Sequence, residues 1–253
     1  MNFKMNMITS TLLAAGFSLL AGSAAAQTCV ANNCATLGFT KSEDNCEGDI
    51  IRCPFDTSKV FCKEKKVYAP KPGDILYSDG TISDSVIASK TPVGIVAYVN
   101  GSNGFAVSLT EVSKTWSSGY EDVSCLTNYS SSSKAMTDMN GKTNTMCLVN
   151  YSGSYSYPAA EYCNTFSAVS NGKGSSGWYL PAAGELYSMS FSYGAINLGL
   201  QKLSKTQISS NYYWSSSEGT TYGPGAWVVR PSDGYMYDYT KNLSGRVRCV
   251  LAF

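Results

Sequence analysis

Nine cysteines follow an N-terminal segment that has the three parts of a secretory signal, and this combination limits the fold more than any other feature. Lys4 provides a positive start, an apolar stretch runs from Ile8 to Leu20, and Ala24–Ala26 form a small-residue cleavage site. We expect residues 1–26 to be a signal peptide. The mature chain is then secreted (periplasmic, outer surface or extracellular), with no membrane insertion after signal cleavage. In such compartments cysteines without a C-x-x-C pair are expected to form disulfides.

The cysteines are dense at the N-terminal side and sparse afterwards. Five lie in a stretch too short to build much hydrophobic core, so we interpret residues 27–66 as a small disulfide-rich module. They are Cys29, Cys34, Cys46, Cys53 and Cys62. Several pairings are possible there, and the odd total leaves one thiol free or bound to another molecule. Lysine and proline at 67–72 predict a linker, and residues 73–253 form a second domain.

The chain contains no histidine, which excludes histidine-based triads, histidine general bases and zinc sites that need histidine. Loss of Lys4 with the signal leaves 18 basic residues (19 minus one) against 18 acidic ones. A neutral mature chain has no charge pattern for nucleic acid or anionic lipid. With no recognisable catalytic constellation, we expect no enzyme activity, no cofactor and no nucleic-acid partner.

Short apolar runs between Gly, Asn and Asp turns predict the strands of the second domain. They are expected at 74–78, 81–83, 93–99, 105–109, 212–215, 226–229, 234–239 and 246–253. Proline at the first turn and one apolar face predict helices at 158–166 and 181–189, and a third is expected at 195–203. The Ser-, Thr- and Asn-rich segment 113–156 is expected to form long loops, held by a Cys125–Cys147 bridge. Strands with helices between them indicate an α+β domain.

Four motifs in the second half of the chain occur in one order in a group of bacterial proteins. They are Gly177-Trp-Tyr-Leu-Pro-Ala-Ala-Gly-Glu-Leu186, Tyr213-Trp-Ser-Ser-Ser-Glu218, Ala226-Trp227 and Arg246-Val-Arg-Cys-Val-Leu-Ala-Phe253. With them the chain resembles the Lcl C-terminal domains, the formylglycine-generating enzyme and the variable proteins of diversity-generating retroelements. The resemblance implies a C-type-lectin-like fold over 73–253: twisted antiparallel sheets with two or three helices and long loops.

The same resemblance implies further features of the core and of the chemistry. A cysteine of the first helix commonly bridges to the last strand of this fold, which implies a Cys163–Cys249 disulfide. Trp178, Trp214 and Trp227 are expected in the core. The sequence does not decide whether Trp116, in a polar segment, is buried or exposed. The calcium-binding strings of lectins (Glu-Pro-Asn, Gln-Pro-Asp, Trp-Asn-Asp) are absent, so no metal site is expected. A formylglycine-type oxidase is the weaker alternative, because no cysteine other than Cys249 follows Cys163.

Residues 219–245, between these motifs, are rich in Tyr, Ser, Gly, Asn and Asp, as antibody binding loops are. In the retroelement-diversified relatives this segment is rewritten through codons of the form NNY, which cannot encode Gln, Glu, Lys, Met or Trp. Those residue types occur here only at Trp227, Met236 and Lys241. The segment therefore resembles a diversified binding surface.

We expect this segment to contact a protein or glycan ligand at a cell surface. The candidate contact residues are Tyr222, Arg230, Asp233, Tyr235, Tyr237, Asp238, Tyr239 and Asn242. Because strand side chains alternate, the three tyrosines at 235, 237 and 239 are expected to form an exposed stripe, with Met236 and Asp238 on the opposite face. Plain surface loops, and a structural envelope or pilus-associated protein, are the alternatives.

Overall fold

The computed structural model describes residues 49–253 except 54–55, 64–67 and 221–224. The chain divides into two compact units, Met1–Val67 and Tyr68–Phe253. The expected signal peptide and the cysteines before residue 49 lie outside the described residues. Within the described part, no helix is both long and apolar enough to span a bilayer.

The first unit contains an antiparallel hairpin of β1 (Asp49–Cys53) and β2 (Asp56–Lys63). Cys53 is buried and disulfide-bonded. Residues 68–72 of the expected linker, 67–72, fall within the second unit. The Tyr68 hydroxyl and the Lys71 amide both donate to Asp74 Oδ2, at 2.9 and 2.8 Å. Because Asp74 is buried, these bonds fix residues 68–72 to the second unit.

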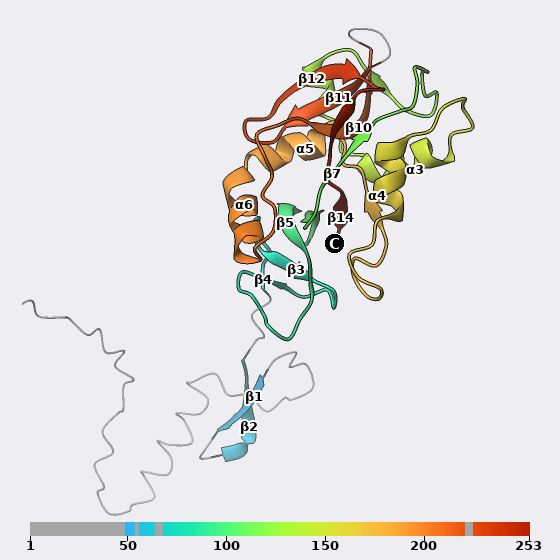
Figure 1. Cartoon of the computed structure of the whole chain (residues 1–253). Helices are drawn as coiled ribbons and strands as arrows, with labels where there is room; N and C mark the ends of the chain where they lie inside the picture. The colour runs from blue at the N-terminus through green and yellow to red at the C-terminus, as the bar shows by residue number, and fades with distance from the viewer. Residues whose placement is uncertain (1–48, 54–55, 64–67, 221–224) are drawn as a thin grey trace, which may run out of the picture. The chain divides into compact units, whose positions relative to one another are not determined.

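Two mostly antiparallel six-stranded sheets form the second unit, which is an α+β domain (Figure 1). One sheet has the order β4-β3-β5-β6-β14-β9 and the other β12-β11-β10-β13-β7, with β8 paired to β10. The strands of the first sheet are β3 (Ile75–Tyr77), β4 (Ile82–Ser83), β5 (Pro92–Asn100), β6 (Asn103–Ser108), β9 (Trp178–Tyr179) and β14 (Val250–Ala252). Those of the second are β7 (Val112–Thr115), β8 (Asn128–Tyr129), β10 (Tyr213–Gly219), β11 (Gly225–Arg230), β12 (Tyr235–Thr240) and β13 (Ser244–Val247).

The three expected helices are present, with shifted ends. They are α4 (Pro158–Thr165), α5 (Ala183–Ser190) and α6 (Tyr193–Lys202). Helix α5 begins after Pro181, and the Glu185 carboxylate accepts the Ala182 N–H at 2.8 Å, which satisfies an amide at the helix start. Figure 1 shows α5 and α6 on one flank of the second unit and α3 and α4 on the other.

The expectation of long loops over 113–156 is wrong in part. The segment contains α2 (Ser132–Ala135) and the ten-residue helix α3 (Gly141–Asn150), besides short strands. Helix α3 is held by tertiary contacts. The Thr145 hydroxyl accepts the Leu180 N–H at 3.0 Å, and within the helix it donates to Gly141 O at 2.8 Å. The Cys125–Cys147 disulfide, which the sequence predicted, joins α3 to the loop between β7 and β8.

Two hydrophobic clusters form the core, because central strands such as β10 are buried on both faces. Neighbouring residues of one strand enter different clusters: Tyr213 faces the cluster beneath α5 and α6, and Trp214 faces the cluster beside α3 and α4. Trp178, Trp214 and Trp227 are buried as expected, and Trp116 is buried too. Each indole N–H donates to a backbone carbonyl; that of Trp116 reaches Ser215 O at 2.8 Å.

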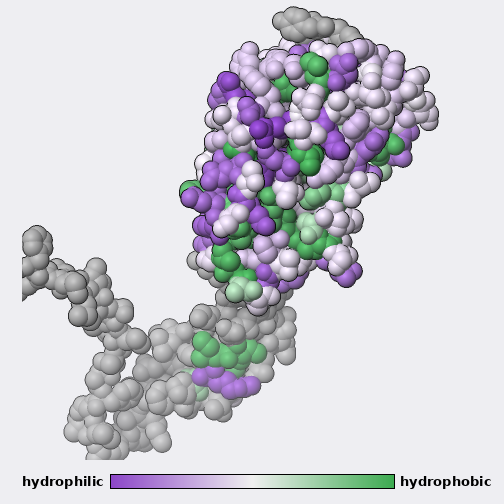
Figure 2. Space-filling model, in the orientation of Figure 1, coloured by the Kyte–Doolittle hydropathy of each residue, from purple (hydrophilic) through white to green (hydrophobic). Residues whose placement is uncertain are grey.

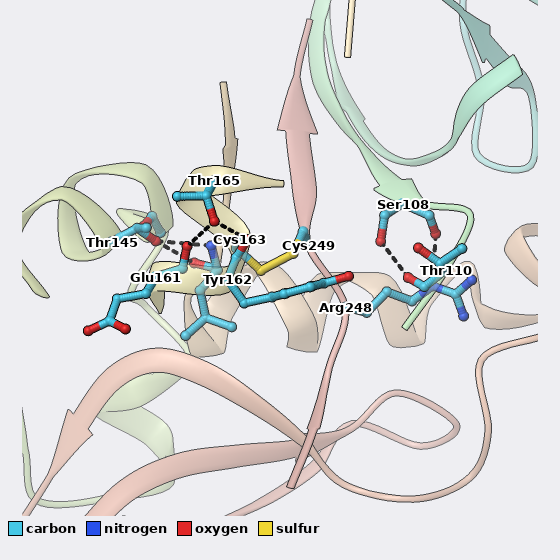
Figure 3. The surroundings of a disulfide bond; sticks show 11 residues. Ser108, Thr110, Thr145, Glu161, Tyr162, Cys163, Thr165, Arg248 and Cys249 are labelled. Carbon is cyan, nitrogen blue, oxygen red and sulfur yellow. Dashed lines mark hydrogen bonds between the residues drawn. A yellow bond between two sulfur atoms is a disulfide. The ribbon is translucent and has the colours of Figure 1, made fainter. Parts of the chain in front are cut away.

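The last expected strand is two strands, one in each sheet. Residues 248–249 make the crossing between β13 and β14. Cys249 is bonded to Cys163 of α4, as the resemblance implied (Figure 3). The buried Arg248 donates to Ser108 O and Thr206 O, both at 2.9 Å. The crossing is thus fixed to helix α4 through the disulfide, and to the end of β6 and the loop after α6 through Arg248.

The two disulfides should contribute unequally to stability. The Cys163–Cys249 bridge spans 86 residues and the Cys125–Cys147 bridge spans 22. Since a cross-link removes more entropy from the unfolded chain when its loop is longer, replacing the first pair by alanines should cost about 4 to 5 kcal/mol and the second about 3 kcal/mol. Urea unfolding of the two double variants measures the difference. An equal or reversed order would contradict this account.

Candidate functional site

The β11–β12 hairpin carries most of the residues that the sequence marks as contacts. Its turn is closed by the Gly234 N–H, which donates to Arg230 O at 2.8 Å. Gly234 has a φ of 75°, and a Cβ there would lie 2.9 Å from the Tyr187 ring. Glycine therefore both permits the turn and lets α5 approach it.

The tyrosines of β12 share one face, as the alternation predicts. Tyr235, Tyr237 and Tyr239 stand opposite Arg230, Val228 and Ala226 of β11. The side chain of Tyr235 is 56% exposed, whereas Tyr237 and Tyr239 are half-buried against the α3/α4-side cluster. The stripe is thus exposed at the turn and joins the core at its other end.

Asp238, which the sequence suggested as a contact residue, is buried and cannot be one. Its side chain is only 7% exposed and lies on the opposite face with Met236. The physical reason is the two-residue period of a strand, which cannot present Asp238 together with its tyrosine neighbours. A Cβ on Gly219 or Gly225 would collide with the Asp238 carboxylate, so glycines in β10 and β11 make room for it.

Five aromatic rings pack in a continuous row that runs from the buried core to the exposed Tyr235, and we call this row the aromatic face: Tyr212, Trp214, Tyr235, Tyr237 and Tyr239. Neighbouring ring centroids are 4.8 Å apart for Tyr212–Tyr237, 5.7 Å for Tyr237–Tyr239 and 5.6 Å for Trp214–Tyr239. Burial raises the pKa of Tyr237. Because each ring is packed against another, the exposed ones are held in place before any ligand arrives.

Arg230 and Asp233 stand at the turn end of the aromatic face. The Arg230 Nε and Nη2 donate to the Asp233 carboxylate at distances of 2.6 to 3.0 Å. The Arg230 guanidinium also lies 5.4 Å from the ring centroids of both Tyr212 and Tyr235. The hydrogen bonds between the two side chains raise the pKa of Arg230 and lower that of Asp233. The pair therefore stays ionised and mutually neutralised.

The remaining candidates are not part of this arrangement. Tyr222 lies outside the described residues. Asn242 is exposed in the connection after β12, at the opposite end of the strand from Arg230. The structure therefore brings together Arg230, Asp233 and the three β12 tyrosines.

A polar cleft of about 300 Å³ lies at that opposite end, lined by Glu121, Asp122, Asn128, Glu218, Gly219, Thr220 and Lys241. Its floor is the buried ion pair of Lys241 and Glu218. The Glu218 carboxylate also accepts the Val123 N–H at 3.1 Å, and Lys241 Nζ donates to Glu121 O at 2.6 Å. These groups hold the 121–123 segment against β10 and β12, which is a structural task.

Sequence reasoning missed Tyr212, which contacts Tyr235, Tyr237 and Arg230. A signal was present, because Tyr212 precedes Trp214 by two residues in an expected strand and so shares its face. The contacts were expected within 219–245, whereas Tyr212 stands outside that range, directly before β10.

Comparison with known proteins shows similarity to a family model and to solved structures. A fimbrial protein from Bacteroides ovatus ATCC 8483 has a similar fold, with a TM-score of 0.57 and 20% identity. The match covers 73% of this chain and 49% of that one, so the chain spans about half the length of that structure. No curated protein matches significantly. The family model of the Lcl C-terminal domain matches residues 115–251, and the chain belongs to this family.

Proposed function

We propose that the protein is secreted or displayed at the cell surface and recognises a protein or glycan there through the aromatic face. The observation that carries this proposal is the set of pre-positioned rings of β12 and Tyr212, beside the neutralised Arg230–Asp233 pair. Tyrosine and arginine are the residues that most often anchor interfaces. Family membership and the signal-like N-terminus fit a surface role.

The surface around β12 also fits recognition. Figure 2 shows mostly pale and purple colours over the upper part of the second unit, with isolated apolar residues. Tyrosine hydroxyls are solvated there in the free state and can bond to ligand groups in the bound state. Rings that are already held lose little conformational entropy on binding, which favours affinity.

Binding should depend on Tyr235, the exposed ring of the aromatic face. We expect Tyr235→Ser to lower the affinity of the fluorescently labelled mature chain for cells about ten-fold or more, as loss of an interface anchor does. Its thermal midpoint should change little, because Tyr235 is largely solvated. Flow cytometry with cells of the producing strain and of its neighbours measures the affinity.

Tyr120→Ser is the matched control, since Tyr120 is 49% exposed and does not belong to the aromatic face. An unchanged affinity of Tyr235→Ser, or an equal loss in Tyr120→Ser, would place the site elsewhere. Triple replacement of the β12 tyrosines is a poorer test, because Tyr237 and Tyr239 also pack against the core.

We propose, as a finer point, that this C-type-lectin-like domain varies in 219–245 as the retroelement-diversified proteins do. The residue types that NNY codons cannot encode stand here at Trp227, Met236 and Lys241, and all three side chains are buried. The exposed Tyr235 and Asp233 are types that such codons do encode. A diversified segment needs this division between a constant interior and a variable surface.

Diversification predicts a pattern among isolates of the producing species. Substitutions should occur at Arg230, Asp233 and Tyr235 and spare Trp227 and Met236, because only the former leave the core unchanged. A near-identical template repeat should lie beside a reverse-transcriptase gene. Sequencing of the locus from many isolates tests both points. Changes spread evenly over the domain, without such a repeat, would rule diversification out.

A fimbria-associated structural protein is the second candidate, favoured by the fold likeness to the Bacteroides fimbrial protein. On this hypothesis the protein should co-purify with surface fibres sheared from the cells. Immunoblotting of the sheared fibres and of the culture medium measures its distribution. Recovery in the medium alone, with none in the fibres, would exclude this role.

A further inference from the structure

Phe191, directly after α5, has the most exposed large apolar side chain among the residues that the structure describes, at 77%. Its ring packs edge-to-face on Tyr187, with the centroids 5.3 Å apart. A phenylalanine side chain has no polar atom that water can satisfy. A single exposed apolar residue is ordinary on a protein surface, so its neighbours decide whether it has a role.

The neighbours connect Phe191 to the aromatic face. The Tyr187 ring lies against Gly234, so close that a Cβ on Gly234 would be 2.9 Å from two of its carbons. Gly234 is followed by Tyr235, the exposed end of the aromatic face. Aromatic side chains therefore border both sides of the β11–β12 turn: Tyr235 on one side and Tyr187, on which Phe191 packs, on the α5 side.

The charges at this turn argue against an acidic ligand. Arg230 donates three hydrogen bonds to Asp233, so its positive charge is already neutralised. It also lies over the Tyr212 and Tyr235 rings. A sulfated or uronic-acid polysaccharide, or an anionic lipid, would find no net positive charge at this turn.

The ring orientations argue against a flat stacking platform. The interplanar angles are 81° for Tyr212–Tyr237, 80° for Tyr237–Tyr239 and 85° for Tyr187–Phe191. Adjacent rings therefore do not lie in one plane on which a chain of sugar rings could stack. A protruding phenylalanine fits a concave apolar pocket, which is a feature of protein surfaces.

We infer that the ligand is a protein with an apolar pocket, and that Phe191 is a second anchor for it, across the turn from Tyr235. This inference rests on the proposed function, since it extends the aromatic face over the turn and names the class of its partner. Phe191 lies outside 219–245, so it supplies a constant contact beside the tyrosines.

The test uses the full mature chain, labelled with a fluorophore, and intact cells of the producing strain and its neighbours. The cells are used untreated, after proteinase K, which removes surface proteins, or after periodate, which oxidises glycans. Phe191→Ser and Tyr235→Ser are compared with Leu198→Ser. Leu198 is 61% exposed on α6, so it is a matched control for loss of an exposed apolar side chain.

We expect binding to disappear after proteinase K and to survive periodate. Phe191→Ser and Tyr235→Ser should each lower the affinity about ten-fold, and Leu198→Ser should leave it unchanged. If periodate abolishes binding and proteinase K does not, the ligand is not a protein and the inference is overturned. A lower affinity of Tyr235→Ser in that case still supports the aromatic face as the binding site. Wild-type affinity of Phe191→Ser overturns the second anchor. An absence of saturable binding to untreated cells overturns the proposed function itself.

Discussion

The crossing of the chain between its two sheets, at Arg248 and Cys249, is the constraint on which the rest of the domain depends. β13 pairs with β10 in one sheet, and β14 pairs with β6 in the other only two residues later. A disulfide to α4 and a buried guanidinium bound to two backbone carbonyls fix this crossing. Because β10 lies between β13 and β11, the same crossing sets where the β11–β12 hairpin stands.

Because β10 is buried on both faces, it gives the aromatic face a rigid base. Trp214 is fully buried and donates to Lys114 O, and Tyr239 packs on it. From there the rings pass outward through Tyr237 to Tyr235, so each exposed ring rests on a less exposed one. A recognition surface built in this way takes its rigidity from the core, whereas a free loop would have to be ordered on binding.

Sequence alone predicted most strands, helices α4 to α6, and the faces of the β12 side chains, because these follow from short-range periodicity. It missed α3, because Gly141, Asn144 and two threonines favour helices weakly and tertiary contacts hold the helix. The Cys163–Cys249 pair came from resemblance to a family, since spacing cannot pair distant cysteines. The contact surface was only partly predictable. Tyr212 stands directly before β10 and Phe191 directly after α5, both outside 219–245, and the alternation along β12 turns Asp238 to the opposite face.

One ion pair stands at each end of β12: a buried pair at one end and a partly exposed pair at the turn. This difference in burial separates the structural end of the strand from the end proposed for recognition. Lys241 and Glu218 are both buried, so loss of either partner leaves an uncompensated charge in the core. Arg230 and Asp233 are partly exposed, so their exchange for other residues costs little stability. The end of the hairpin at Lys241 is therefore fixed and the turn end is tolerant. Between them, outward side chains can change while Met236 and Trp227 continue to hold the strands to the core.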